Sequence, residues 1–168
     1  MCLWRKKQQE PITEPPKEEP LVKEAVIYQM IERPYNIYSQ KDPMWANIKI
    51  GNGKLQMRDY GCLLACLGMM LKVPPYMVNS ILAQIHGFNE KSEVIWAKVE
   101  KAFKVRYRYH DKDPKKLCIA ETNHYKPKFP QHFVLWVGDG RIVDPLDKEP
   151  VEKENKYKMV SFRTLEKA

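Results

Sequence analysis

A chain of 168 residues with 43% hydrophobic side chains is long enough to fold around a single core and too short for two full domains. Its 29 basic and 21 acidic side chains leave a net charge of +8, which favours an anionic partner such as nucleic acid, a membrane surface or a cell-wall polymer. The sequence has no run of about 20 apolar residues, so we predict no membrane span. Its start lacks the apolar stretch of a secretory signal peptide, so a cytoplasmic location is expected unless other machinery carries the chain.

Residues 1–25 are rich in proline and charge and hold few large apolar side chains. Such a segment buries too little surface to offset the entropy of ordering it, so we predict a flexible arm over 1–25 and a folded domain over 26–168. The first 24 residues carry five basic and five acidic side chains, so the whole surplus of +8 belongs to the rest of the chain. The folded part is therefore the basic part.

The first part of the domain is broken by prolines and a Gly-Asn-Gly turn signal, so short extended pieces and turns are expected there. Three helices are predicted to follow. Apolar residues recur at helical spacing over residues 62–72. A second helix is predicted over 74–87, with proline in its first turn and Gly87 at its end. A third is predicted over 92–103, with Ser92 as its N-cap.

After residue 104 the pattern changes to an alternation with period two, which is typical of strands. Five strands are predicted, over residues 105–110, 116–122, 132–137, 141–144 and 157–163. The pair Asp139-Gly140 tolerates positive φ and predicts a two-residue hairpin between the third and fourth strands. Helices first and strands afterwards predict the α+β class, with N-terminal helices packed on an antiparallel β-sheet.

The four cysteines, Cys2, Cys62, Cys66 and Cys118, fit no small disulfide scaffold, so reduced thiols are expected. Cys62 begins the first predicted helix, whose N-terminus carries about half a positive charge and therefore favours a thiolate. A nucleophilic cysteine also needs a base within reach. His132, which opens the most apolar predicted strand, is the candidate.

A third group usually orients such a histidine. Asp144 ends the strand that the hairpin returns alongside the strand of His132, so their contact is plausible. Simpler roles stay open: Cys62 as a packing cysteine, His132 as a structural histidine and Asp144 as a turn cap. Cys66 is expected to pack in the core rather than to form a disulfide with Cys62. A zinc site of Cys62, Cys66, His132 and Cys118 is disfavoured, because paired ligands with a two-residue gap are absent.

Four stretches follow one another along residues 38–146, about two thirds of the chain: YSQKDPMWA, YGCLLACLGMML, PPYMVNSIL and QHFVLWVGDGRIVDPL. In this order they resemble the C39-like branch of the papain-like cysteine peptidases. The resemblance implies a papain-like fold and a catalytic set of Cys62, His132 and Asp144, with Gln40 helping to form the oxyanion hole. Glycine precedes the cysteine here, whereas in many members it follows. This form resembles C39-like domains of phage tail and lysin proteins.

The sequence therefore predicts a cysteine peptidase or amidase that cleaves an amide bond through an acyl-enzyme, without a metal or organic cofactor. The resemblance implies a peptidoglycan peptide as substrate, as in a phage-type murein hydrolase, and a virion-associated location with the arm attached to a larger phage assembly. Another peptide substrate stays open. The alternative function is a catalytically silent papain-like structural or binding component of a virion. Nucleic-acid binding through the basic residues 104–108 is least favoured, because any amphipathic strand shows the same alternation.

Overall fold

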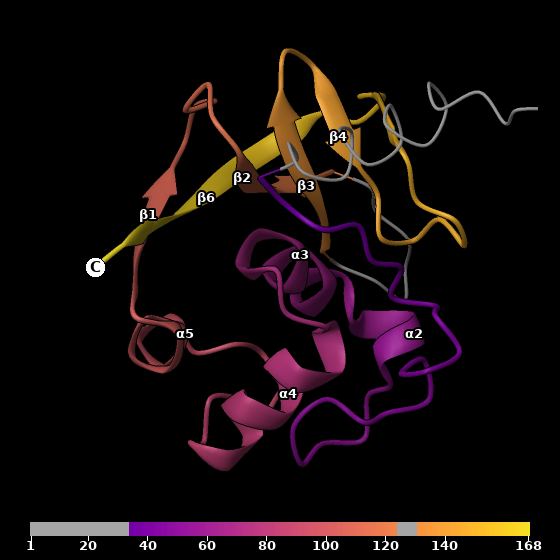
Figure 1. Cartoon of the computed structure of the whole chain (residues 1–168), viewed down its shortest axis with the longest axis vertical. Helices are drawn as coiled ribbons and strands as arrows, with labels where there is room; N and C mark the ends of the chain where they lie inside the picture. Colours follow the sequence, from indigo (N-terminus) through magenta and orange to yellow (C-terminus); the bar gives the residue numbers. More distant parts are fainter. Residues whose placement is uncertain (1–33, 124–130) are drawn as a thin grey trace, which may run out of the picture. The chain divides into compact units, whose positions relative to one another are not determined.

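The computed structural model describes residues 34–123 and 131–168 (Figure 1). The arm predicted over residues 1–25, and the start of the domain predicted from residue 26, lie outside these residues. Within them the protein is an α+β structure in which helices come first and a six-stranded antiparallel sheet follows. The predicted class is confirmed.

The described helices are α2 (Met57–Tyr60), α3 (Cys62–Leu71), α4 (Pro75–Gln84) and α5 (Trp96–Phe103). The predicted first and second helices correspond to α3 and α4, while the single turn of α2 was not predicted. α4 stops at Gln84, and the Gly87 N–H then closes the turn on a carbonyl inside the helix. No single helix in the described ranges is long and apolar enough to cross a membrane; α3 and α4 pass that test only together, as a pair bent by 101°.

The predicted N-cap role of Ser92 is wrong. Helix α5 begins four residues later, at Trp96, with Ile95 as its N-cap, and no side chain caps it. Ser92 instead has φ +63° within a tight turn. The Asn89 side chain makes that turn, because its Oδ1 accepts from the N–H of Glu93 at 2.9 Å. A local asparagine turn therefore replaces the expected helix start.

Six strands form one sheet, in the spatial order β1-β6-β2-β3-β4-β5. Their bounds are β1 (Val105–His110), β2 (Cys118–Thr122), β3 (His132–Gly138), β4 (Arg141–Val143), β5 (Glu152–Glu154) and β6 (Met159–Lys167). The five predicted strands are confirmed, although β2 and β6 each start two residues later than expected, β4 ends one residue earlier, at Val143, and β6 continues to Lys167. β5 was missed because its three residues, Glu-Lys-Glu, show no apolar alternation.

The hairpin between β3 and β4 has the predicted two-residue loop. Asp139 has φ +49° and Gly140 has φ +74°, the conformation that this kind of turn requires. The turn pairs Leu135 with Val143 across the two strands. Asp144 follows directly, so the hairpin brings it beside the start of β3.

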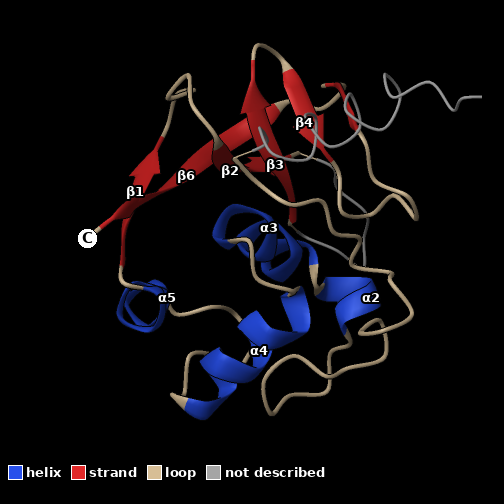
Figure 2. Cartoon of the chain, in the orientation of Figure 1, coloured by secondary structure: helices blue, strands red, loops and turns tan. Residues whose placement is uncertain are grey.

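Helix α3 lies between the sheet and α4 (Figure 2). It packs against β3 on one side and against α4 on the other, and Figure 2 shows the helices gathered on one side of the strands. Leu64 and Leu67 are buried in a cluster that includes Ile119 and Phe133 of the sheet. Burial of such side chains stabilises the fold by about 2 kcal/mol each. This packing fixes α3 against the sheet and, with it, the position of Cys62.

Candidate active site

Cys62 is the first residue of α3, as predicted. The turn that precedes it requires glycine at position 61, because a Cβ there would lie 2.4 Å from the Met57 carbonyl oxygen. The Gly61 N–H donates to the same oxygen at 2.7 Å, which ends α2 against the start of α3. The first N–H groups of a helix have no acceptor within it, so the Cys62 sulfur lies where the helix presents partial positive charge.

The His132 side chain lies between Cys62 and Asp144. Its Nε2 is 2.9 Å from Asp144 Oδ1, and the Cys62 side chain is close enough to raise the pKa of the ring. Since Nε2 faces the carboxylate, Nδ1 is left for the sulfur. Cys62 and His132 are 8% and 3% exposed, so both are almost covered. The structure thus brings together three of the four predicted site residues; their chemical roles stay predictions.

Asp144 is the hydrogen-bond acceptor that holds this arrangement. Its Oδ1 accepts from the His132 ring and, at 2.9 Å, from the Leu146 N–H. Burial alone would raise the pKa of Asp144, but these hydrogen bonds outweigh burial and hold its pKa well below the ordinary range. For His132 burial acts in the other direction and lowers the pKa. The interactions with Asp144 and Cys62 outweigh it and raise the pKa of His132 from 6.5 to about 9. The pair is therefore a buried carboxylate and a ring that favours its protonated form.

Tyr157 is a site residue that sequence reasoning missed. Its hydroxyl donates to Asp144 Oδ2 at 2.6 Å, and its ring meets the His132 ring edge-on, with centroids 5.9 Å apart. Burial and the hydrogen bond to Asp144 raise the pKa of Tyr157 above its ordinary value. In the sequence this tyrosine was merely the first residue of a predicted strand, and nothing in its spacing to Asp144 signals the contact.

Gln40 is buried, at 1% exposed. Its Nε2 donates to the Arg58 carbonyl at 2.8 Å, and its backbone N–H donates to the Pro145 carbonyl at 2.9 Å. Its Oε1 has no hydrogen-bond partner among the described residues. Gln40 therefore links the segment before α3 to the turn after Asp144, and its predicted oxyanion role stays a prediction.

The other two described cysteines are free thiols sealed in the core. Burial raises the pKa of Cys66 well above its ordinary value and that of Cys118 to about 12. Both are therefore inert at neutral pH. Within residues 34–123 and 131–168, no group of three or more His, Cys, Asp or Glu side chains is placed to hold a metal ion.

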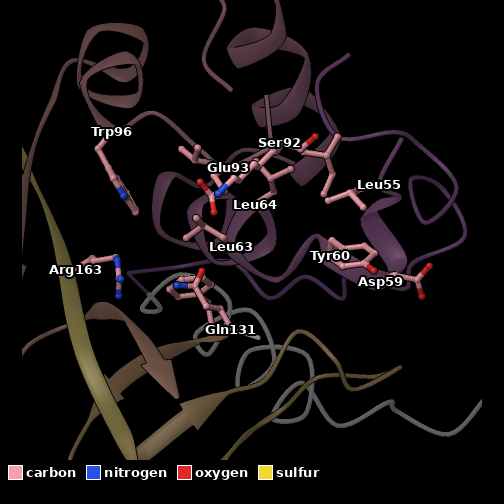
Figure 3. Close-up of a pocket in the computed structure, with 14 residues that line it drawn as sticks. Leu55, Asp59, Tyr60, Leu63, Leu64, Ser92, Glu93, Trp96, Gln131 and Arg163 are labelled. Atoms are coloured by element: carbon pink, nitrogen blue, oxygen red, sulfur yellow. The ribbon is translucent and has the colours of Figure 1, made fainter. Parts of the chain in front are cut away.

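A groove of about 460 Å³ lies beside the start of α3 and the start of β3 (Figure 3). Its walls include the sequence neighbours of Cys62 and His132, on the helix side and on the sheet side: Leu63, Leu64, Gln131 and Phe133. The residues that line it do not include Cys62 or His132 themselves.

The two ends of the groove differ in character. In Figure 3, Tyr60 and Asp59 lie toward one end, and Trp96 and Arg163 toward the other. Tyr60 is 38% exposed, so its end opens to solvent. The groove thus combines apolar and aromatic walls with acidic and basic groups. Such a lining can contact both apolar and charged groups of a ligand.

Arg163, which lines the groove, is a second residue that the sequence did not reveal. Its guanidinium donates to Glu121 at 2.7 Å and to Ser161 at 2.9 Å, and lies 4.8 Å from the centroid of the Phe133 ring. Phe133 directly follows His132. The ion pair of Arg163 and Glu121 therefore holds a cation against the residue next to His132. Sequence reasoning passed over it because a charge alternating with apolar residues is ordinary in an amphipathic strand.

Comparison of the chain with protein-family models, with curated proteins and with solved structures finds no match. The geometry of Cys62, His132 and Asp144 therefore carries the functional proposal.

The coupling between His132 and Asp144 predicts a pH-dependent stability. Because the folded state raises the pKa of His132 from 6.5 to about 9, folding favours the protonated ring. The resulting stability is fully present below pH 6.5 and is lost as the pH rises through 9; a shift of this size corresponds to about 3 kcal/mol. Urea unfolding at pH 6 and pH 9.5 should show this loss in the wild-type protein.

The matched variant for this measurement is His132→Gln. The raised pKa values of Cys66 and Cys118 also destabilise the fold at high pH, because thiols ionise more readily in the unfolded chain. That contribution is common to both proteins and cancels in the difference. Equal losses in the wild type and His132→Gln would show that His132 and Asp144 are not coupled as described.

Proposed function

We propose that the protein is a papain-like cysteine peptidase or amidase with Cys62 as nucleophile, His132 as base and then acid, and Asp144 as the group that orients the ring. The Cys62 thiolate attacks the amide carbonyl carbon, and His132 gives its proton to the departing amine. Water then attacks the thioester, with His132 accepting its proton, and the carboxylic acid is released. The observation that carries this proposal is the placement of the His132 ring between the Cys62 thiol and the Asp144 carboxylate.

The developing oxyanion needs hydrogen-bond donors next to the sulfur. The Cys62 N–H, at the start of α3, is the first candidate. Gln40 is the second, because its Nε2 uses only one of its two N–H groups on the Arg58 carbonyl. Its side chain binds the Arg58 carbonyl four residues before Cys62, and its backbone binds Pro145 directly after Asp144. It is therefore tied to both sides of the catalytic set.

The groove supports a peptide as substrate. Its apolar walls would take side chains, while its charged groups would bind polar ends or side chains of the same peptide. Among peptides we favour the stem or cross-bridge of peptidoglycan, because a net charge of +8 promotes binding to an anionic wall. A phage-type murein hydrolase associated with a virion fits this substrate, and a protein substrate is the second possibility.

Alkylation of Cys62 tests the proposed nucleophile directly. The protein is treated with iodoacetamide between pH 5 and 9, and each cysteine is quantified by peptide mapping, with glutathione as the reference for an ordinary thiol. Cys62 should react at pH 5.5 at least about 50-fold faster than glutathione, since an ordinary thiol with a pKa of about 8.5 is then almost wholly protonated. Cys66 and Cys118, buried and protonated, should stay unlabelled until the protein unfolds.

The substrate is tested with purified peptidoglycan sacculi beside a denatured polypeptide. Solubilisation of sacculi with new free amines identifies a murein peptidase or amidase, whereas cleavage of the polypeptide alone identifies a protein peptidase. If neither is cut and Cys62 alkylates like glutathione, the catalytically silent structural component becomes the better reading.

A further inference from the structure

We propose that Tyr157 is the positioning residue for the active-site histidine: its hydroxyl fixes the Asp144 carboxylate and its ring braces the imidazole, so that His132 keeps its other nitrogen on Cys62. This role deepens the proposed function and rests on it for its catalytic meaning. The arrangement itself, however, can be measured without any substrate.

The hydrogen bonds to Asp144 divide between its two oxygens. Oδ1 accepts from both His132 and the Leu146 N–H, whereas Oδ2 accepts from the Tyr157 hydroxyl at 2.6 Å. Asp144 is 1% exposed, so water does not replace a lost donor easily. Without the hydroxyl, a buried and charged oxygen would lack its donor, and the carboxylate would turn or take up a proton. In either case its hold on the imidazole weakens.

The tyrosine is itself held in place by its backbone. Asn155 accepts from the Tyr157 N–H and donates to the Tyr157 carbonyl, both at 2.8 Å. The backbone N–H of Asn155 in turn donates to the Gly140 carbonyl at 2.7 Å, in the hairpin between β3 and β4. The same hairpin places Asp144 beside His132. One turn therefore sets the positions of the carboxylate and of the hydroxyl that binds it.

The ring of Tyr157 restricts the imidazole further. It meets His132 edge-on at an interplanar angle of 80°. Edge-to-face contacts of this kind favour one orientation of the two rings. The hydroxyl and the ring thus act on two different members of the catalytic set from one side chain.

Other ionisable groups face this cluster and must be allowed for in any titration. Charge interactions link the cluster of His132, Asp144 and Tyr157 to Cys62 and Cys66 on α3 and to Asp147 after the turn. The Lys156 ammonium also lies 5.6 Å from the centroid of the Tyr157 ring. These groups are unchanged in a Tyr157→Phe variant, which removes one oxygen and keeps the ring. A difference from the wild type then reports the hydroxyl alone.

The experiment is an NMR titration of the histidine rings in the full chain, with His132 assigned by its loss in His132→Gln. In Tyr157→Phe the pKa of His132 should fall by about one unit, and its slowly exchanging Nε2 proton should broaden or disappear. Asn155→Ala, which keeps the hydroxyl but frees the backbone, should shift the pKa in the same direction by less. The matched control is Tyr35→Phe, which removes a tyrosine-to-carboxylate hydrogen bond of 2.6 Å to Glu152.

The outcomes separate this inference from the proposed function. A His132 pKa in Tyr157→Phe that stays at or above the value in Tyr35→Phe and the wild type overturns the positioning role. A fall confined to Tyr157→Phe and Asn155→Ala supports it. Iodoacetamide alkylation of Cys62 in the wild type, measured on the same samples, tests the peptidase instead. Ordinary thiol behaviour there would overturn the enzyme, while the shift at His132 would still establish how the ring is held.

Discussion

Replacing Cys62 with alanine is expected to abolish amide hydrolysis, a loss of about 10⁴-fold or more that brings the rate near the uncatalysed background. In the proposed mechanism the acyl-enzyme forms on the Cys62 sulfur, and no other described thiol can take its place, since Cys66 and Cys118 are buried and protonated. Release of free amines from sacculi or from a polypeptide gives the rate. Hydrolysis that persists in Cys62→Ala at the wild-type rate would exclude the proposed nucleophile.

Cys66→Ala is the matched control for this substitution. Cys66 lies one turn further along α3, is fully buried and has the same side chain. Its removal should leave a small cavity and cost about 1 kcal/mol of unfolding free energy, while the hydrolysis rate remains close to that of the wild type. The same chemical change at two neighbouring positions thus separates a catalytic loss from a packing loss. If Cys66→Ala were as inactive as Cys62→Ala, general damage to α3 would explain both.

The sequence predicted the elements whose signals are local. Apolar spacing located α3 and α4, alternation located five strands, and Asp139-Gly140 identified the hairpin. The contact between His132 and Asp144 was also predictable, because a two-residue turn leaves little freedom in where the next strand returns. These predictions succeeded because each depends on residues close together in the chain.

The parts that sequence reasoning missed depend on distant residues or on competition between local signals. Tyr157 reaches Asp144 only through the path of the chain after β4 and the turn at Asn155, which no periodic pattern encodes. The ion pair of Arg163 and Glu121 joins two strands that are neighbours in space but far apart in sequence. Ser92 failed as an N-cap because Asn89 made a competing turn. Tertiary contacts of this kind override local propensity.

Replacing His132 with glutamine is expected to remove both the base and the group that favours the thiolate, with a loss of hydrolysis of about 10⁴-fold. Glutamine can still donate a hydrogen bond to Asp144, so the carboxylate keeps a partner and the fold is less disturbed than it would be by alanine. The same variant should change the alkylation of Cys62. At pH 6 an ordinary thiol is only about 0.3% thiolate, so labelling of Cys62 by iodoacetamide should fall toward the rate of an ordinary thiol.

His110→Gln is the control that makes the His132 result specific. His110 lies on β1, and its Nε2 hydrogen-bonds the Thr164 hydroxyl at 2.9 Å, at a partly buried position. Its replacement should leave both hydrolysis and the labelling of Cys62 close to wild type. Because hydrolysis and labelling report different steps, they also divide the role of His132. If His132→Gln lost hydrolysis but still labelled rapidly at pH 6, the ring would act only in proton transfer, and the start of α3 would have to stabilise the thiolate by itself.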